Sequence, residues 1–164
     1  MQIRKASIAD YTIIYDIAIP VWEATYKTLL TGEQMDYMLN LFYSEEAITE
    51  QIALKNHQFL LAVDDEGLHL GFASYEVNFL SETTKLHKLY VLPQAHGKGV
   101  GKALVTVIEN AAKKHLNDKL LLNVNRFNPA VQFYIKSGFE NKGEDNVDIG
   151  NGYFMEDYLM IKQL

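Results

Sequence analysis

The chain has 164 residues, a formal net charge of −6 and no cysteine. This length suits one compact domain, residues 1–164, whose hydrophobic core is large enough to need no disulfide. The hydrophobic share of 48% excludes a chain that is disordered throughout, and the missing cysteines exclude disulfides and cysteine-based covalent catalysis. Because nucleic-acid-binding proteins usually carry a basic surface, the acidic balance argues against a nucleic-acid partner and favours cationic substrates.

No stretch of the sequence has the ~18 continuous apolar residues of a membrane-spanning helix, and the N-terminus lacks the apolar run of a signal peptide. We therefore expect a cytoplasmic protein without a membrane partner. No two histidines have the spacing that would place them on one face of a helix or strand, so we predict no bound metal; the histidines are His57, His69, His87, His96 and His115.

The first third of the chain favours helices after a short opening strand at residues 3–6. Ser7 and Asp10 have the spacing of a capping box, and the helix that they open carries an apolar stripe as far as Pro20, which we expect to stop it. Further helical patterns, divided by the breaker Thr31-Gly32, cover residues 22–30, 33–42 and 44–54.

The middle of the chain combines strands with one strongly amphipathic helix. Residues 58–63 and 71–78 are rich in β-formers and flank a polar turn, so they predict an antiparallel hairpin, and residues 85–92 continue the sheet. The apolar stripe of residues 100–115 is the strongest periodic pattern, and the short apolar run of residues 120–125 follows it. A strand, a crossover helix and a second strand predict a parallel pair with a right-handed connection.

The last part of the chain begins with a helix and returns to strands. Asn128-Pro129 is typical of a helix start, and Ser137-Gly138 is typical of its end. Strands are expected at residues 139–144 and 153–162, with residues 145–152 as an exposed loop between them. Because the final strand is apolar, we expect that it can pair across a homodimer.

Three glycines at alternate positions, Gly97, Gly99 and Gly101, precede the amphipathic helix. Such glycines permit positive φ and a close approach of the backbone to a ligand, and the N-terminus of the helix attracts anions. Two nucleotide motifs fail on spacing: a P-loop needs a hydroxyl residue where Ala103 stands, and a dinucleotide fingerprint needs a third glycine where Lys102 stands. The loop therefore predicts a pyrophosphate site that needs no metal.

The segment His96 to Gly101, with the sequence His-Gly-Lys-Gly-Val-Gly, resembles motif A of the GNAT superfamily of N-acetyltransferases. In that family a Gln/Arg-x-x-Gly-x-Gly/Ala loop holds the pyrophosphate of acetyl-CoA. His96 departs from the family's first residue, and a register that begins at Gln94 also fits the bare pattern. Downstream, Asn128 to Phe139 resembles the family's helix with a tyrosine four residues before Gly-Phe. The other elements also follow the family's order, so the resemblance covers nearly the whole chain.

The resemblance implies a mixed α/β fold, with one domain built on a central twisted sheet of six to seven strands and helices on both faces. It also implies an N-acyltransferase that moves an acetyl group from acetyl-CoA directly to a primary amine of a small molecule or peptide in a ternary complex. Within the superfamily, Leu89-Tyr90-Val91 and residues 22–30 are similar to polyamine-type enzymes. One alternative is a catalytically idle acyl-CoA-binding or regulatory module on the same fold. Another is a nucleotide-binding domain, which the spacing disfavours.

The resemblance also assigns contacts to acetyl-CoA. The backbone of Leu89, Tyr90 and Val91 is expected to pair with the pantetheine arm and to polarise the thioester. Asn128 either contacts the pantetheine or only caps its helix. The pyrophosphate is expected to lie against His96, Gly97, Lys98, Gly99, Val100, Gly101 and Lys102.

The same resemblance makes Tyr134 the expected general acid, because the family's tyrosine at this position lies near the sulfur and can protonate the departing thiolate. The general base stays open. Strand alternation would place His87 on one face with Leu89 and Val91, and its ordinary pKa of ~6.5 suits proton removal near neutrality, although an ordinary strand histidine is the competing interpretation. Glu76 is a second candidate, and a water chain without a dedicated base is a third.

Trp22 and Tyr26 lie in the segment that lines the acceptor side in this family, and Tyr37 follows in the next helical segment. An aromatic wall near an acidic residue such as Glu23 suits an alkyl ammonium through cation–π attraction and charge pairing. We therefore expect an amine acceptor, and these residues are its candidate contacts.

Overall fold

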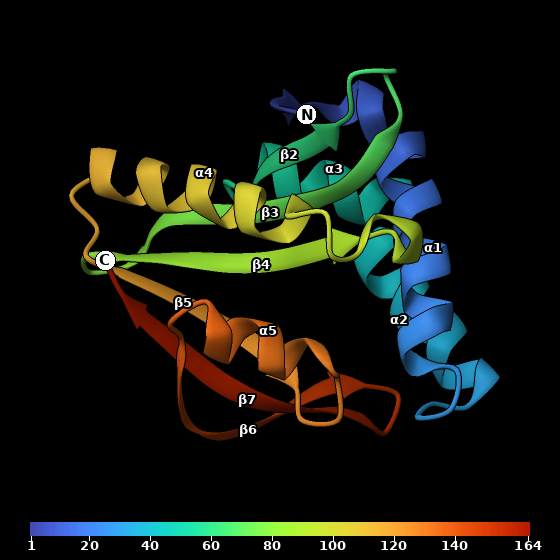
Figure 1. Ribbon diagram of the computed structural model, residues 1–164. Coiled ribbons are helices and arrows are strands. Elements are labelled where there is room, and N and C mark those ends of the chain that lie inside the picture. Colours follow the sequence, from blue (N-terminus) through green and yellow to red (C-terminus); the bar gives the residue numbers. More distant parts are fainter.

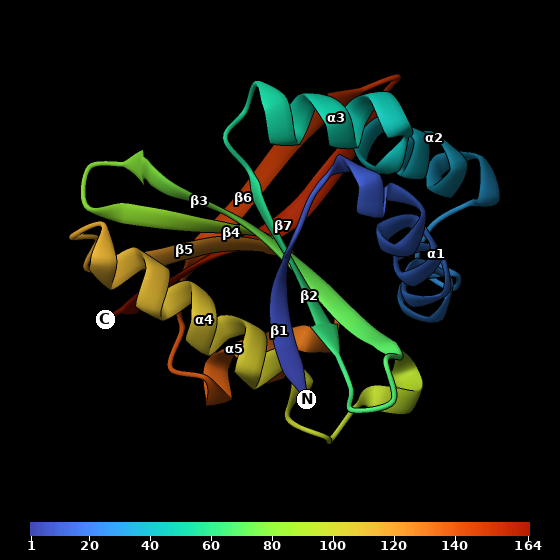
Figure 2. The same ribbon diagram turned by 90° about the horizontal axis from the view of Figure 1, so that it is seen from above.

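The computed structural model describes residues 1–164 as one seven-stranded mixed sheet with helices on both faces (Figures 1 and 2). This confirms the expected fold class. The strands are β1 Gln2–Ala6, β2 Gln58–Val63, β3 His69–Leu80, β4 Thr83–Val91, β5 Lys119–Asn125, β6 Glu140–Gly150 and β7 Tyr153–Gln163, in the spatial order β1-β2-β3-β4-β5-β7-β6. The helices are α1 Tyr11–Tyr26, α2 Gly32–Tyr43, α3 Glu45–Ala53, α4 Val100–Lys114 and α5 Ala130–Lys136. No helix has the length and hydropathy needed to cross a membrane.

Two hydrophobic clusters hold the helices to the sheet. On one face, α4 and α5 cover a cluster that includes Leu104, Ile108 and Leu122. On the other face, α1, α2 and α3 cover a second cluster around Ile14 and Phe72 (Figure 2). Both faces of the central strands are therefore shielded from solvent, which explains why these strands are largely apolar.

The N-terminal helix is longer than the sequence indicated. The capping box is confirmed, because the Ser7 amide donates to the Asp10 carboxylate at 2.9 Å and the Ala9 amide donates to the Ser7 hydroxyl at 3.3 Å. The prediction that Pro20 stops the helix is wrong, since α1 runs through it to Tyr26. Proline removes one helical hydrogen bond, but the buried face of α1 continues on both sides of it, with Ile17 before and Trp22 after.

The C-terminal strands are also longer than expected. The predicted loop at residues 145–152 is wrong, because β6 extends to Gly150 and only Asn151 and Gly152 connect it to β7. Both connecting residues have positive φ, as a tight two-residue hairpin turn requires. Strand β7 lies between β5 and β6, so its two edges are already paired and it cannot join a second copy as the final strand was expected to do.

Strand β4 carries a β-bulge at His87. The residues on either side of it, Leu86 and Lys88, oppose the consecutive β3 residues Tyr75 and Ser74, so His87 has no partner across the ladder. The bulge reverses the alternation. Leu89 packs on the α4 side while Lys88 contacts rings of the α1–α3 cluster, and the predicted sharing of a face by His87 and Leu89 is therefore wrong.

Strands β4 and β5 are parallel and joined by α4, as expected, but they stay paired over only four positions, from Thr83↔Lys119 to Leu86↔Leu122. Beyond that point β4 continues along β3 to Val91, and β5 continues along β7 to Asn125. Figure 1 shows the two strands spreading apart. The centre of the sheet is therefore open at the end where the glycine loop lies.

A buried asparagine ties the closed end of this opening together. Asn117, just after α4, accepts from the Thr84 hydroxyl at 2.7 Å and from the Asn78 amide at 3.0 Å through its side-chain oxygen. Its side-chain nitrogen donates to the Asn78 side chain at 2.6 Å. The contacts join the end of α4 to β3 and β4.

We predict that Asn117→Ala lowers the free energy of unfolding by about 2–3 kcal/mol, because the substitution leaves the buried Thr84 hydroxyl and the Asn78 amide without partners. Urea denaturation measures this change. The control is Asn40→Ala on the exposed side of α2, which should alter stability by less than about 0.5 kcal/mol. Equal effects of the two substitutions would contradict the structural role of Asn117.

Candidate functional site

A cavity of about 950 Å³ occupies the opening between β4 and β5 and extends under α1, α2 and the β6–β7 hairpin. It brings together almost all of the predicted site residues from distant parts of the sequence. Lys98, Glu76 and Tyr37 do not line it. The predicted residues that do line it are Trp22, Tyr26, His87, Leu89, Tyr90, Val91, His96, Gly97, Gly99, Val100, Gly101, Lys102, Asn128 and Tyr134.

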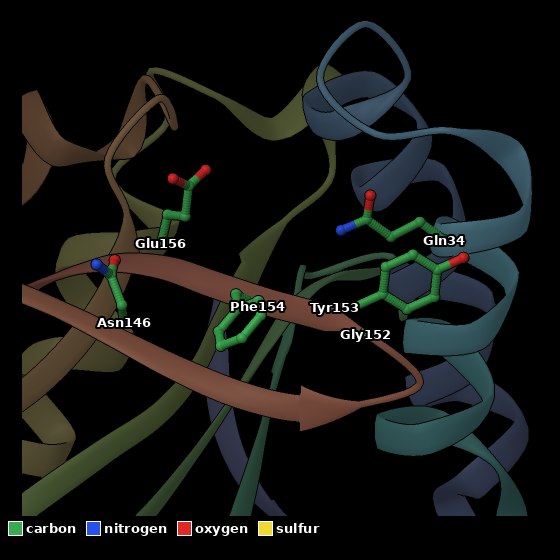
Figure 3. Close-up of a pocket in the computed structure, with 6 residues that line it drawn as sticks. All are labelled: Gln34, Asn146, Gly152, Tyr153, Phe154 and Glu156. Atoms are coloured by element: carbon green, nitrogen blue, oxygen red, sulfur yellow. The ribbon is translucent and has the colours of Figure 1, made fainter.

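A second, shallower hollow lies outside the cavity, between α2 and the β6–β7 hairpin. Figure 3 shows Gln34 reaching from α2 and Glu156 standing on the hairpin beside the same hollow. Phe154 lines both the hollow and the cavity, so the two adjoin at this ring. The hairpin that was expected to be a simple exposed loop therefore forms part of the wall of the site.

The glycine loop presents a row of free backbone donors. Gly97 and Gly99 have φ values of 76° and 79°, which favour glycine, and Gly99 stands at the N-cap of α4. The first helical bond starts from the Ala103 amide, and none of the backbone N–H groups from Gly99 to Lys102 has a backbone acceptor in the protein. These donors, with the positive end of the α4 dipole, have the chemistry that an anion such as pyrophosphate requires.

Contacts within the protein explain why glycine stands at position 101 and histidine at position 96. A Cβ at Gly101 would lie 3.2 Å from the Phe133 ring, so the glycine allows α4 and α5 to approach each other. His96, which replaces the family's Gln or Arg, lies with its ring Nε2 2.9 Å from the carbonyl of Val91. This contact fixes the turn that leads from β4 into the loop.

Tyr134 is buried in the wall of the cavity, 7% exposed, with the rings of Phe133 and Phe139 at 5.4 and 5.7 Å. Its hydroxyl has no hydrogen-bond partner within the protein, so it is free to meet a ligand. Burial, with a smaller effect of Tyr90, raises the pKa of Tyr134 well above its ordinary value. The hydroxyl therefore keeps its proton at neutral and mildly alkaline pH, as a general acid must.

Asn128 connects the start of α5 with the aromatic wall. Its side-chain oxygen accepts from the Ala130 amide at 2.8 Å, a contact that helps to start the helix and leaves the expected pantetheine contact untested. Its side-chain nitrogen donates to the Tyr26 hydroxyl at 3.0 Å. Tyr26 in turn packs against Trp22, with ring centroids 4.8 Å apart. By contrast Glu23, the acidic residue expected near these rings, is exposed and does not line the cavity.

The two predicted base candidates contact each other at the far end of the cavity. The Nε2 of His87 lies 3.0 Å from the Glu76 carboxylate, and the ring of His57 stacks on that of His87 with centroids 3.8 Å apart. Burial lowers the pKa of His87 to about 2, and His57, Lys85 and Lys88 act in the same direction. His87 is therefore neutral and only weakly basic at pH 7.

The same three residues, His57, Glu76 and His87, contain ligand types that bind metal ions, with their ligand atoms within 4.8 Å of one another. A metal ion binds in the plane of an imidazole ring, along the nitrogen lone pair. The two rings are stacked with only 17° between their planes, so one ion cannot lie in both planes unless the rings turn. The arrangement as it stands fits a histidine–carboxylate contact better than a metal site.

Sequence reasoning missed two buried charged residues of the cavity, Asp157 on β7 and Lys88 on β4. A single acidic residue in a strand pattern has no local signal, and the bulge at His87 hid the direction of Lys88. Lys88 donates to the Gln51 side chain at 2.7 Å and lies over the rings of Tyr43 and Phe59 at 5.5 and 6.0 Å. It has no carboxylate partner, and burial lowers its pKa to about 7.

The sequence model of the acetyltransferase (GNAT) domain family matches residues 27–154. The chain belongs to the GNAT acetyltransferase family. A spermidine N(1)-acetyltransferase of Thermoplasma acidophilum is 29% identical over 153 residues, which cover 90% of this chain and 93% of that protein. The crystal structure of the PaiA N-acetyltransferase of Thermoplasma acidophilum in complex with coenzyme A superposes with a TM-score of 0.82 at 27% identity, covering 99% of this chain and 98% of that one.

A GNAT protein of Rhodopseudomonas palustris shares the fold, with a TM-score of 0.81 at 23% identity over 99% of this chain and 95% of that one. These comparisons confirm the resemblance inferred from the glycine loop and the Tyr134 helix. The protein is an acetyl-CoA-dependent N-acetyltransferase with the GNAT fold. The alternatives of an idle binding module and a nucleotide-binding domain give way to this assignment.

Lys88, which is buried without a carboxylate partner, lowers the stability of this GNAT protein by an amount that depends on pH. The pKa of Lys88 is lower in the folded chain than the ~10.4 of an unfolded lysine, so the unfolded chain binds more protons between pH 7 and about 10, and stability rises with pH in that range. We predict that Lys88→Met raises the free energy of unfolding by about 1–3 kcal/mol at pH 6, and that this gain shrinks as the pH approaches 10.

Urea denaturation of both proteins between pH 6 and 10 measures the difference. The exposed Lys5→Met is the matched control and should change stability by less than about 0.5 kcal/mol at each pH. A constant difference between the Lys88 variant and the wild type across this range would show that Lys88 is not titrating as described.

Proposed function

We propose that the enzyme acetylates a primary amine of a small aliphatic polyamine, with spermidine as the representative acceptor. The observation that carries this proposal is the similarity to the spermidine N(1)-acetyltransferase, which extends over 90% of the chain. The site supports it in two ways. Trp22 and Tyr26 supply aromatic faces for an alkyl ammonium, and the net charge of −6 favours a cationic substrate over an anionic one.

On the donor side, we propose that the pyrophosphate of acetyl-CoA binds the free N–H groups from Gly99 to Lys102, with Gly97, Val100 and His96 shaping the loop. Lys98 and Lys102 are both exposed and add positive charge. The pantetheine arm would then enter the opening between β4 and β5 and pair with the backbone of residues 89–91. This edge of β4 has no strand partner beyond Leu86.

The proposed chemistry is a direct transfer. The amine nitrogen attacks the thioester carbonyl carbon, the bond from carbon to sulfur breaks, and Tyr134 donates its hydroxyl proton to the departing thiolate. A backbone N–H of the free β4 edge would polarise the carbonyl oxygen. Asn128 contributes by holding Tyr26 and the start of α5, the helix that carries Tyr134.

A thiol-release assay with acetyl-CoA and a panel of amines tests the acceptor. The panel contains spermidine, spermine, a diamine, amino acids and a peptide with a free N-terminus. We expect spermidine or spermine to give the highest kcat/KM, with a product heavier by one acetyl group in mass spectrometry. Preference for amino acids or the peptide would overturn the acceptor class, and release of CoA with no amine in the panel would overturn the proposed function.

Several expectations from the sequence stay predictions. They are a cytoplasmic location, the lack of a bound metal, and the roles of His87 and Glu76 as bases. A homodimer also stays a prediction, although it would have to use a surface other than the paired edges of β7.

We predict that Gly99→Ala raises the Kd of acetyl-CoA about tenfold, because a Cβ at φ 79° is strained by about 1–2 kcal/mol and the loop must leave the conformation that points its N–H groups at the phosphates. Isothermal titration calorimetry measures the Kd. Gly32→Ala is the matched control, since its Cβ also meets open space but its φ is not positive. Equal affinities of the Gly99 variant and the wild type would contradict the role of the loop.

We predict that Tyr134→Phe lowers kcat about 10²-fold while the Kd of acetyl-CoA changes less than twofold, because only the proton donor is lost. Steady-state kinetics and calorimetry provide the two numbers. Because burial raises the pKa of Tyr134, wild-type turnover should not fall on the alkaline side before about pH 10. The exposed Tyr15→Phe on α1 is the control; turnover of the Tyr134 variant equal to that of this control at every pH would remove the assignment.

A further inference from the structure

The cavity contains a buried carboxylate that the proposed chemistry has not used. Asp157 on β7 is 2% exposed, lines the cavity, and has a side-chain oxygen, Oδ2, that is buried without a hydrogen-bond partner. Burying a carboxylate without partners is costly, and buried polar groups in proteins are nearly always paired. An unpaired one in the wall of a substrate cavity indicates that its partner is the ligand.

The neighbours of Asp157 do not supply that partner. Across the ladder on one side lies Asp145 of β6, whose own carboxylate accepts from the Asn123 side chain at 2.8 Å. The nearby guanidinium of Arg126 is already paired with Glu144 at 2.6 Å and Glu156 at 2.7 Å. Of the two adjacent carboxylates, Asp157 and Asp145, only Asp145 has a hydrogen-bond partner, and Lys85 is the one other cation whose charge reaches Asp157. Two carboxylates beside one such lysine leave a negative site, which attracts a cation and repels an anion.

The aromatic wall of the cavity complements this charge. Tyr26 and Tyr90 are close enough to Asp157 for their ionisation to be affected by its charge, and Trp22 packs on Tyr26. Ring faces and a carboxylate together recognise an alkyl ammonium, the rings through their quadrupoles and the carboxylate through a charge-assisted hydrogen bond. A metal ion would instead require further oxygen or nitrogen ligands at this point.

We propose that Asp157 binds the reacting ammonium group of the acceptor and removes the proton that the nitrogen loses when the acetyl group is transferred. This inference rests on the proposed function and names a catalytic residue within it. It assigns the two proton-transfer roles to two elements that line the cavity: Asp157 on β7 serves the amine, and Tyr134 on α5 serves the thiolate.

The proton balance is as follows. The bound ammonium first gives one proton through Asp157 to solvent, which leaves a neutral amine beside an ionised carboxylate. The nitrogen then bonds to the carbonyl carbon and the carbon–sulfur bond breaks; the remaining excess proton on nitrogen moves to Asp157, and the Tyr134 proton moves to the sulfur. Return of a proton from Asp157 to the Tyr134 phenoxide through solvent restores the enzyme, with the acetylated amine and CoA as products.

The electrostatics of Asp157 suit this role better than those of His87. Burial raises the pKa of Asp157 to about 6, Asp145 acts in the same direction, and Lys85 of β4 and Arg126 oppose it. The other titratable groups that its charge reaches are Tyr26 of α1 and Tyr90 of β4. A carboxylate with this pKa is ionised at pH 7 yet accepts a proton readily, whereas His87 with a pKa of about 2 accepts one poorly.

The test compares Asp157→Asn with Asp145→Asn, its cross-strand neighbour outside the cavity lining. Steady-state kinetics with spermidine from pH 5 to 9 should show kcat/KM lowered about 10²- to 10³-fold in Asp157→Asn, with loss of the decline in activity that we expect of the wild type below about pH 6. Asp145→Asn should keep that decline and move it to lower pH, because one neighbouring negative charge is gone. Asp157→Glu, which retains a carboxylate, should also keep it.

Calorimetry separates binding from chemistry. Spermidine titrated into the CoA-loaded enzyme should bind at least tenfold more weakly to Asp157→Asn than to the wild type, while acetyl-CoA affinity stays within twofold. Because the penalty of the buried ionised carboxylate is present above pH 6, Asp157→Asn should melt at the same or a higher temperature than the wild type at pH 8. A melting temperature that is not lowered would show that misfolding does not cause the loss of activity.

Unchanged spermidine affinity together with a wild-type pH profile in Asp157→Asn would overturn the inference while leaving the proposed function intact. A wild-type enzyme that acetylates no amine of the panel would overturn the proposed function instead. A weakened spermidine affinity with an unaltered pH profile would show that Asp157 only anchors the ammonium, and would overturn its role in proton transfer.

Discussion

The separation of β4 from β5 after Leu86 and Leu122 is the constraint on which the rest of this structure depends. Each strand keeps its outer neighbour, β3 or β7, so the sheet remains continuous at its sides while its centre opens. The opening leaves one edge of β4 without a partner beside a loop whose amides are also free. An extended cofactor arm that ends in a pyrophosphate would satisfy both sets of donors and acceptors at once, and the proposed donor site rests on this match.

The opening also explains the unusual burial of polar groups around it. Tyr134, Asp157 and Lys88 lie in the wall of one cavity. Burial favours the neutral form of each, because it raises the pKa of Tyr134 and Asp157 and lowers that of Lys88. A core built only for stability would pair or avoid such groups. The large apolar clusters on the two faces of the sheet offset the free-energy cost of burying these groups, so the fold can stay stable with polar side chains in its cavity.

Much of this arrangement was predictable from the sequence because its signals are local. The glycine loop, the apolar stripe of α4 and the spacing from Asn128 to Tyr134 each lie within one segment. The wrong predictions concern features that depend on contacts between segments far apart in the sequence. Packing on both sides of Pro20 keeps α1 intact, pairing with β3 creates the bulge at His87, and pairing with both β5 and β6 makes a buried carboxylate of Asp157. The Asn151-Gly152 turn is different, since that dipeptide is itself a hairpin signal.

The central claim is that acetyl-CoA occupies the opening between β4 and β5. Hydrogen–deuterium exchange of the backbone amides tests it most directly, because the amides on the free edge of β4 and in the glycine loop are the groups that the ligand must engage. We expect acetyl-CoA to slow exchange at least tenfold in residues 89–91 and 97–102, and an equal concentration of ATP to leave it unchanged. Calorimetric binding of acetyl-CoA with no protection in these two segments would contradict the account.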